Sequence, residues 1–193
     1  MKKLPRRFYL RPTLQVAKGL LGKFIVRRLH GKTLIGKIVE VEAYRGSIDP
    51  ASHAYKGMTR RNEVMFLQGG HLYVYFTYGM HFCANVVTRK AGIGEAVLLR
   101  AVEPVKGIET MQRNRGNSRL ETKKLTSGPA RFCQAFGIAR KENGTNLMSN
   151  TILIANGEKI ARSQIGVSTR IGINVAMRKR WRFFVKGNVW VSR

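Results

Sequence analysis

The sequence predicts an α+β fold, in which a single domain has a curved antiparallel β-sheet core with packed short helices. Several runs alternate apolar and polar residues, as strands with one buried face do. Turn residues separate neighbouring runs, and this favours antiparallel hairpins. The 193 residues, 44% of them hydrophobic, suffice for one core, and the sequence has neither an internal repeat nor a linker. We therefore expect residues 1–193 to form one domain.

The N-terminal third predicts a helix, a hairpin and a long loop. Apolar residues recur at helical spacing over residues 13–22, from the possible N-cap Thr13 to the possible stop Gly22. The β-rich runs KFIVRRL and TLIGKIVEVEA are separated by His30 and Gly31, which is typical of a hairpin. Residues 45–70 break any period and predict an ordered loop of the kind that often carries function.

The rest of the chain predicts further strands and two helices. The runs LYVYFT, MHFCANVVT and EAVLLRAV predict three adjacent antiparallel strands. The segment 103–116 favours a helix, and Pro129 predicts the start of a second short helix that ends near Gly137. Asn156 and Gly157 lie between alternating runs and predict another hairpin.

The charge indicates a polyanionic partner. Lys and Arg number 36 against 10 acidic residues, giving a formal charge of +26. Nucleic acid is the first candidate because binding to phosphates releases counterions. An anionic membrane is the second, but prolines and arginines interrupt the N-terminal segment, and no stretch is long enough to span a bilayer. We expect a soluble cytoplasmic protein, in which Cys83 and Cys133 are reduced core residues and no metal site is present.

Three acidic residues, Glu40, Glu42 and Asp49, fall within ten positions of one another in a very basic chain. Period-2 geometry places Glu40 and Glu42 on one face of a strand. They could form a solvated face with salt bridges to Lys and Arg. One carboxylate could instead activate water, kept ionised by positive charge that lowers its pKa. All three could also hold Mg²⁺ in a nuclease.

The run HLYVYFTYGM is unusually rich in aromatic residues. A core strand is one interpretation, since aromatic residues are common in strands. However, Tyr73 and Tyr75 share a face on which bases could stack, each contributing about 1–3 kcal/mol. Tyr78 lies at a turn and could wedge into the space that an extruded nucleotide leaves.

Five runs of the chain together resemble the alkyladenine (3-methyladenine) DNA glycosylase family, of the methylpurine-DNA glycosylase type. They are VEVEAYRGSIDPASHAYKG, MFLQGGHLYVYFTYGMHFCANVV, AVLLRAVEP, LTSGPARFCQAFGI and RFFVKGNVWVS. The resemblance covers nearly the whole chain in order. It implies the family's single-domain fold, with no metal or organic cofactor. It also implies a monofunctional, monomeric enzyme without an obligate protein partner, which flips damaged purines from double-stranded DNA and leaves an abasic site.

The resemblance also implies roles for individual residues. Glu42 matches the general base, Arg100 matches the arginine that helps to hold the attacking water, and Tyr78 matches the tyrosine inserted into DNA. The other matched positions form the base pocket, and they are Tyr44, Ala51, His53, Tyr75, Asn85 and Leu98. Asn85 matches the residue that disfavours guanine by crowding its 2-position. Glu40 receives no role, and Glu40→Gln is expected to be milder than Glu42→Gln.

The chain departs from the family pattern at three loop positions. Arg60, Gly69 and Val189 stand where the pattern usually has proline, and their presence predicts softer segments around the pocket entrance. Two rival functions remain at this point. They are a metal-dependent nuclease that uses Glu40, Glu42 and Asp49, and a non-catalytic nucleic-acid binder.

Overall fold

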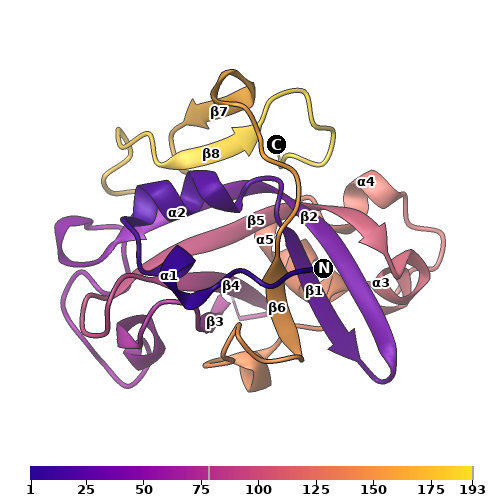
Figure 1. Cartoon of the computed structure of the whole chain (residues 1–193), viewed down its shortest axis with the longest axis horizontal. Helices are drawn as coiled ribbons and strands as arrows, with labels where there is room; N and C mark the ends of the chain where they lie inside the picture. Colours follow the sequence, from indigo (N-terminus) through magenta and orange to yellow (C-terminus); the bar gives the residue numbers. More distant parts are fainter. Residues whose placement is uncertain (78, 193) are drawn as a thin grey trace.

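The computed structural model describes residues 1–77 and 79–192, and eight of its strands join into one antiparallel sheet (Figure 1). The strands are β1 (Phe24–Leu29), β2 (Lys32–Arg45), β3 (Leu72–Thr77), β4 (His81–Thr88), β5 (Glu95–Lys106), β6 (Ile152–Ala155), β7 (Ile165–Ser168) and β8 (Arg182–Val185). The main path runs in the order β3-β4-β5-β2-β1-β6, and the β7–β8 pair joins it through β2. The sheet is open. Together with the short helices described next, this antiparallel sheet confirms the predicted α+β class.

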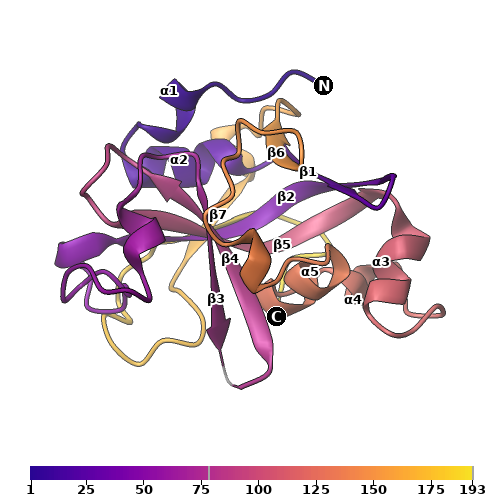
Figure 2. The same cartoon turned by 90° about the horizontal axis from the view of Figure 1, so that it is seen from below.

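Short helices cover the sheet. They are α1 (Arg6–Tyr9), α2 (Thr13–Leu20), α3 (Ile108–Asn114), α4 (Thr122–Leu125) and α5 (Pro129–Ala135), with single 3-10 turns at Gly46–Ile48, Glu63–Phe66, Arg140–Glu142 and Arg162–Gln164. Figure 2 shows α1 and α2 in one region of the molecule and α3, α4 and α5 grouped in another. Buried residues of α2, α3, α4 and α5 all join one core cluster with the sheet. Within the described residues, none of the helices has the length and apolar character that crossing a membrane requires.

The long strand β2 organises the sheet. Its first half pairs with β1, from Lys32 to Lys37, and its last part pairs with β8, from Glu40 to Glu42, while β5 runs along its other edge. The register with β5 shifts between Glu40 and Val41, whose partners are Ala101 and Leu99. Arg100 is therefore the extra residue of a β-bulge, and such bulges re-aim side chains at functional sites.

Most of the predicted elements are confirmed. The predicted helix is present as Thr13–Leu20, but Pro12 and not Thr13 is its N-cap, because the Thr13 hydroxyl bonds to Thr88 and Glu95. The hairpin at His30 and Gly31 is present, with positive φ angles of 48° and 72° that suit a tight two-residue turn. The three adjacent strands are β3, β4 and β5, and the short helix that begins at Pro129 is α5.

Two sequence predictions about elements were wrong. Residues 103–106 continue β5, where Glu103 pairs with Lys37, and only Ile108–Asn114 is helical. The hairpin at Asn156 and Gly157 does not form, because β6 pairs with β1 and the N-terminal segment occupies its end. Lys3 bridges to Ala155, and the Asn156 N–H donates to the Lys2 carbonyl at 2.8 Å.

Gly69 is held too tightly for a larger residue. Its N–H donates to the Arg89 carbonyl at 2.9 Å, and a Cβ at this position would lie 2.8 Å from the Tyr9 carbonyl oxygen. A proline here would lose the hydrogen bond and clash with Tyr9. The backbone around Gly69, as it stands here, therefore does not accommodate a proline.

Candidate active site

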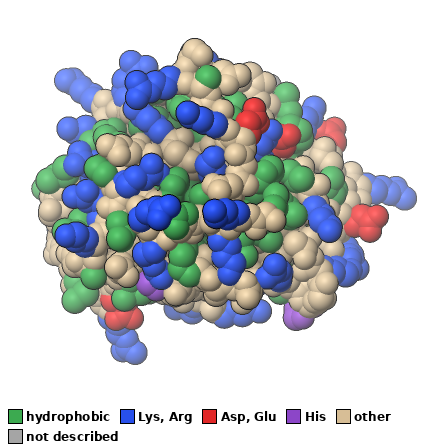
Figure 3. All heavy atoms as spheres, viewed as in Figure 1, with side chains coloured by type: hydrophobic (Ala, Val, Ile, Leu, Met, Phe, Trp, Pro, Cys, Tyr) green, Lys and Arg blue, Asp and Glu red, His purple; other side chains and the backbone are tan. Residues whose placement is uncertain are grey.

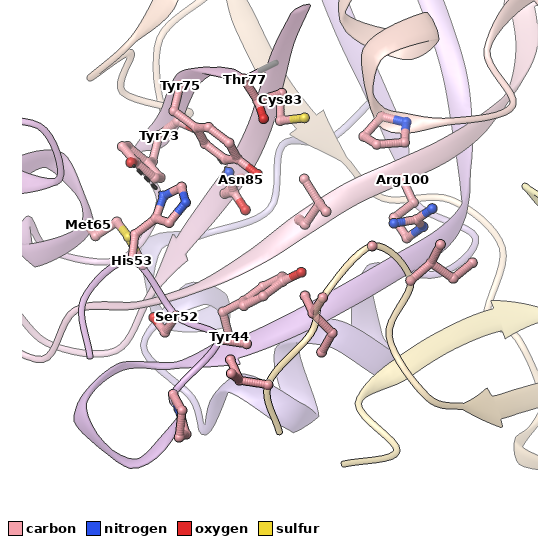
Figure 4. A pocket seen from close by; sticks show the side chains of 18 of the residues that line it. Tyr44, Ser52, His53, Met65, Tyr73, Tyr75, Thr77, Cys83, Asn85 and Arg100 are labelled. Atoms are coloured by element: carbon pink, nitrogen blue, oxygen red, sulfur yellow. Dashed lines mark hydrogen bonds between the residues drawn. The ribbon is translucent and has the colours of Figure 1, made fainter. Parts of the chain in front are cut away.

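A cavity of about 500 Å³ opens beside the end of β2 (Figure 4). Its wall comes from β2, β3, β4 and β5, from the loop after β2, and from the segment 171–175. Seven of the residues matched through the family resemblance line it, namely Tyr44, Ala51, His53, Tyr75, Asn85, Leu98 and Arg100. Tyr78 lies outside the described residues.

One row of the sheet forms the base of the cavity. In the cross-strand register, Glu42 pairs with Leu98, Leu98 with Asn85, and Asn85 with Tyr73, across β2, β5, β4 and β3. Directly paired residues point to the same face of a sheet. The pairing of four strands therefore gathers side chains that are up to 56 positions apart in the sequence.

Aromatic side chains form two opposite walls of the cavity. The rings of Tyr73 and Tyr75 are stacked with centroids 5.5 Å apart, and His53 meets Tyr75 edge-on at 4.5 Å. The Nδ1 atom of His53 lies 3.0 Å from the Tyr73 hydroxyl. Figure 4 shows Tyr44 across the cavity from this group. A flat, apolar ring system can lie between such walls.

Glu42 lies fully buried behind Tyr44. Its Oε2 accepts a hydrogen bond from the Tyr44 hydroxyl at 2.9 Å, and its Oε1 accepts one from the Ile171 N–H at 2.8 Å. Oε1 also lies 3.2 Å from Nη1 of Arg100. The expectation of a lowered pKa was wrong, because burial raises the pKa of Glu42 more than Arg100 and the two hydrogen bonds lower it.

Arg100 connects Glu42 to a second buried carboxylate. Its Nε donates to Oε1 of Glu40 at 3.2 Å, and its Nη2 donates to the Ser192 hydroxyl at 3.3 Å. Glu40 also accepts from Nε of Arg182 at 2.6 Å and from the Ser192 N–H at 2.7 Å. Glu40 is fully buried. The solvated-face interpretation of Glu40 and Glu42 was therefore wrong, although both do form salt bridges.

The remaining predicted pocket residues surround these groups. Asn85 is buried, and its Nδ2 donates to the Tyr73 carbonyl at 3.3 Å. Leu98 provides a buried apolar surface beside it. Ala51 lies on the loop after β2, where its N–H donates to Oδ1 of Asp49 at 3.3 Å.

Titratable groups in the wall are held in their neutral forms. Partial burial and the nearby Arg61 lower the pKa of His53. Burial raises the pKa of the Tyr73 hydroxyl to about 12 and also raises the pKa of the Cys83 thiol. At neutral pH the cavity therefore presents an uncharged imidazole next to aromatic rings.

Several lining residues were not predicted as pocket residues. They are Pro50, Ser52, Arg61, Met65, Thr77, Cys83, Pro129 and the segment 171–175, whereas Tyr73 had been considered as a stacking residue. Strand alternation could have suggested Cys83, which is two residues from Asn85 on β4. No motif marks the segment 171–175, because it reaches the site only through long-range packing.

The three acidic residues of the nuclease hypothesis do not converge. Asp49 is ion-paired with Arg170, while Glu40 and Glu42 are bound by arginines. In residues 1–77 and 79–192, no group of three or more His, Cys, Asp or Glu side chains is placed to hold a metal ion. The nuclease interpretation therefore has no metal site on the described part of the chain.

Comparisons with known proteins give matches over nearly the whole chain. Residues 7–189 match the family model described as methylpurine-DNA glycosylase. The chain is 53% identical to a protein of Carboxydothermus hydrogenoformans over 191 residues, which cover 98% of each chain. It is 50% identical to one of Francisella tularensis subsp. tularensis, covering 94% of each, and 44% identical to one of Chlorobaculum tepidum, covering 100% of this chain and 92% of that one. All three relatives bear the name "Putative 3-methyladenine DNA glycosylase".

This combination of sheet, aromatic cavity and full-length matches defines a DNA repair glycosylase. The chain belongs to the methylpurine-DNA glycosylase family.

Proposed function

We propose that this protein removes alkylated and deaminated purines from double-stranded DNA and leaves an abasic site. The substrates in this proposal are 3-methyladenine, 7-methylguanine, hypoxanthine and ethenoadenine. The observation that carries it is the buried Glu42 carboxylate beside an aromatic cavity of about 500 Å³, which is large enough for a purine base. The names of the relatives support the 3-methyladenine part of the proposal.

In the proposed chemical step, Glu42 activates water. The water oxygen attacks C1′ of the flipped nucleotide, the bond between C1′ and the base nitrogen breaks, and a water proton passes to Glu42. The base leaves with the bonding electrons. The ionised carboxylate also offsets the positive charge that develops on the sugar. The contact of Arg100 with Oε1 of Glu42 supports a role in holding that carboxylate, and in this proposal Arg100 also orients the water.

Base recognition in this proposal depends on stacking. A purine lies between Tyr44 and Tyr75, and a base alkylated at N3 or N7 is cationic and gains about 0.5–2 kcal/mol from the aromatic faces. A cationic base is also a good leaving group. A neutral base must gain a proton as it leaves. The lowered pKa of His53 favours a role as a hydrogen-bonding wall over a role as that acid.

Binding to DNA is proposed to depend on positive charge and on Tyr78. Figure 3 shows Lys and Arg side chains spread over most of one face of the molecule, with few acidic residues among them. Such a surface attracts the phosphate backbone without regard to sequence. Tyr78 takes the place of the flipped nucleotide in this proposal. We further propose that residues 1–193 act as one monomeric, monofunctional and cytoplasmic domain without a cofactor or protein partner.

The direct test is release of free base from DNA. The protein is incubated in EDTA with duplexes that each carry one lesion, and free base and strand breaks are measured separately. We expect free base and intact strands until alkali or heat cleaves the abasic site. Strand breaks without free base, or activity that needs added Mg²⁺, would favour the nuclease. Salt-dependent binding without any product would favour the non-catalytic binder.

A further inference from the structure

Asp49 and Arg170 form a buried ion pair beside the cavity. Nη1 of Arg170 donates to Oδ2 of Asp49 at 2.5 Å, and Nη2 donates to Oδ1 at 2.8 Å. Both side chains are fully shielded from solvent. Two parallel bonds between a guanidinium and a carboxylate fix the relative orientation of both groups. Neither residue has a role in the chemical step proposed above.

The pair connects two segments that line the cavity. Asp49 belongs to the loop after β2, where it also accepts hydrogen bonds from the Arg45 and Ala51 N–H groups at 3.2 and 3.3 Å. Arg170 precedes the segment 171–175, which forms another part of the wall. The ion pair therefore joins two parts of the wall that come from segments about 120 residues apart.

Arg170 also supports the groups around Glu42. Its guanidinium lies 4.7 Å from the centre of the Tyr44 ring, and Nη1 donates to the Ala43 carbonyl at 3.1 Å. The next residue, Ile171, donates its N–H to Oε1 of Glu42. A shift of Arg170 would therefore move both the aromatic wall at Tyr44 and one of the hydrogen bonds that orient the carboxylate.

We propose that Asp49 and Arg170 are positioning residues, a clamp that holds the segment 171–175 against the cavity and keeps Glu42 and Tyr44 in their working geometry. This inference rests on the proposed function, because it assigns the pair to the base-release step. The clamp touches no reacting atom. Its effect on the rate comes from geometry, and small misplacements of reacting groups can slow a reaction about 10²-fold.

A second buried ion pair provides a matched control. Nη2 of Arg27 donates to Oε1 of Glu142 at 2.6 Å, and Oε2 of Glu142 accepts the Ala139 N–H at 2.8 Å. Both side chains are nearly fully buried, and neither residue lines the cavity. Asp49→Asn and Glu142→Gln therefore make the same chemical change. In each, the new amide nitrogen must face either an arginine or a backbone N–H group that needs an acceptor.

The first experiment compares single-turnover base release in the two variants, at a temperature where both are folded. We expect Asp49→Asn to slow release by about ten-fold or more, while Glu142→Gln stays within about two-fold of the unaltered protein. Both variants lose one negative charge, so their affinity for undamaged duplex should not fall. Equal slowing in the two variants, or no slowing in Asp49→Asn, would overturn the clamp and leave a purely structural pair.

The second experiment needs no activity. Trp181 lies 5.2 Å from the Arg170 guanidinium, and the sequence has one other tryptophan, Trp190. In a Trp190→Phe background we expect Asp49→Asn, but not Glu142→Gln, to increase quenching of Trp181 fluorescence by acrylamide. Unchanged quenching in both would contradict the clamp.

The two proposals fail in different ways. If the unaltered protein releases no base from any lesion, the proposed function fails while the fluorescence test still decides whether the clamp exists. Should Asp49→Asn not fold, Arg170→Lys replaces it, because lysine keeps the charge but cannot bind both carboxylate oxygens in parallel. The same outcomes are expected for this variant.

Discussion

At the residue scale, the surroundings of Glu42 have two opposite effects on the pKa of its carboxyl group. Removal from water favours the protonated carboxyl, whereas Arg100, Ile171 and Tyr44 favour the carboxylate. Burial has the larger effect and raises the pKa. Water activation needs the ionised form, so the protein keeps a charge where folding alone would disfavour it. Such a cost to stability is common at catalytic positions.

Glu42→Gln should abolish most base release without harming the fold. The amide oxygen can keep the contacts of Oε1, and the amide nitrogen can donate to the Tyr44 oxygen in place of Oε2. Loss of the base should slow release by about 10²-fold or more. Because the pKa of Glu42 is raised in the folded state, its ionisation opposes folding as pH rises through that pKa. We therefore expect the variant to unfold at the same or a higher temperature at neutral pH.

Single-turnover assays and thermal unfolding of the same preparations check this prediction. Binding to damaged duplex should persist, which separates loss of chemistry from loss of recognition. A variant that unfolds earlier and loses binding as well would show that Glu42 serves mainly to hold the structure together.

The pH dependence of base release should show the raised pKa of Glu42. The carboxylate is available above that pKa, and the rate should fall by about ten-fold for each pH unit below it. A duplex with 7-methylguanine is the best substrate, because its base is already cationic and needs no further proton. Single-turnover rates measured between about pH 4 and about pH 8 check the direction. A rate that rises on acidification with this substrate would contradict the assignment of Glu42 as base.

Asn85 should govern the exclusion of guanine. Stacking cannot discriminate, because every base offers an aromatic face. A clash between the Asn85 side chain and the 2-amino group of guanine can discriminate, because it leaves polar groups unpaired in a buried site. Asn85→Ser shortens the side chain, so release of guanine derivatives should rise relative to hypoxanthine.

The alternative is that Asn85 only satisfies the Tyr73 carbonyl, to which it donates. This alternative predicts lower stability and uniformly lower activity. Base release from duplexes with guanine, 7-methylguanine and hypoxanthine distinguishes the two roles. If a well-folded variant releases guanine derivatives and hypoxanthine in an unchanged ratio, Asn85 does not govern the exclusion of guanine.

At the element scale, irregularities in the pairing of β2 with β5 place the functional groups. The shift at Glu40 aims Arg100 at two carboxylates that regular pairing would have separated from it. A second shift lies between Ile35 and Gly36. Alternation in the sequence predicts the strands, but it does not predict where their register shifts.

Gly36→Ala should destabilise the protein. A Cβ on Gly36 would lie 2.8 Å from Cγ2 of Val102 and 3.0 Å from Cζ of Phe136, so these buried side chains would have to shift. Overpacking of this kind typically costs about 1–3 kcal/mol, more than alanine gains over glycine in a strand. Urea unfolding measures the change. Increased stability would show that the contact relaxes freely, and the rate of base release by folded protein should not change.

How far the sequence predicts the site depends on the range of the contacts. Glu42 and Tyr44 were found because they lie together on one strand in a recognisable run. A solvated face was one interpretation of Glu40 and Glu42, because no local pattern shows that Arg182 and Ser192 bond to Glu40. The prediction of a hairpin at Asn156 and Gly157 was wrong because contacts with distant segments, β1 and the N-terminal residues, decide the conformation there.

At the scale of the whole molecule, burial makes the surface even more positive than the composition suggests. Five of the ten acidic residues are buried, namely Glu40, Glu42, Asp49, Glu95 and Glu142. Most of the 36 basic residues remain on the surface, where few acidic side chains oppose them. The field around the protein is therefore strongly positive, and this favours rapid association with DNA.

Binding to undamaged duplex should be tight and steeply salt-dependent. Each phosphate that the protein neutralises releases counterions, so log K should fall against log salt with a slope of about −0.9 per phosphate contacted. About six contacts would cost about 10³-fold in affinity between roughly 50 and 200 mM salt. Titrations with an undamaged duplex measure this slope apart from catalysis, and Glu142→Gln, which removes a buried charge outside the cavity lining, should leave it unchanged. A nearly flat dependence would mean that phosphate contacts contribute little, and the positive surface would then need another explanation.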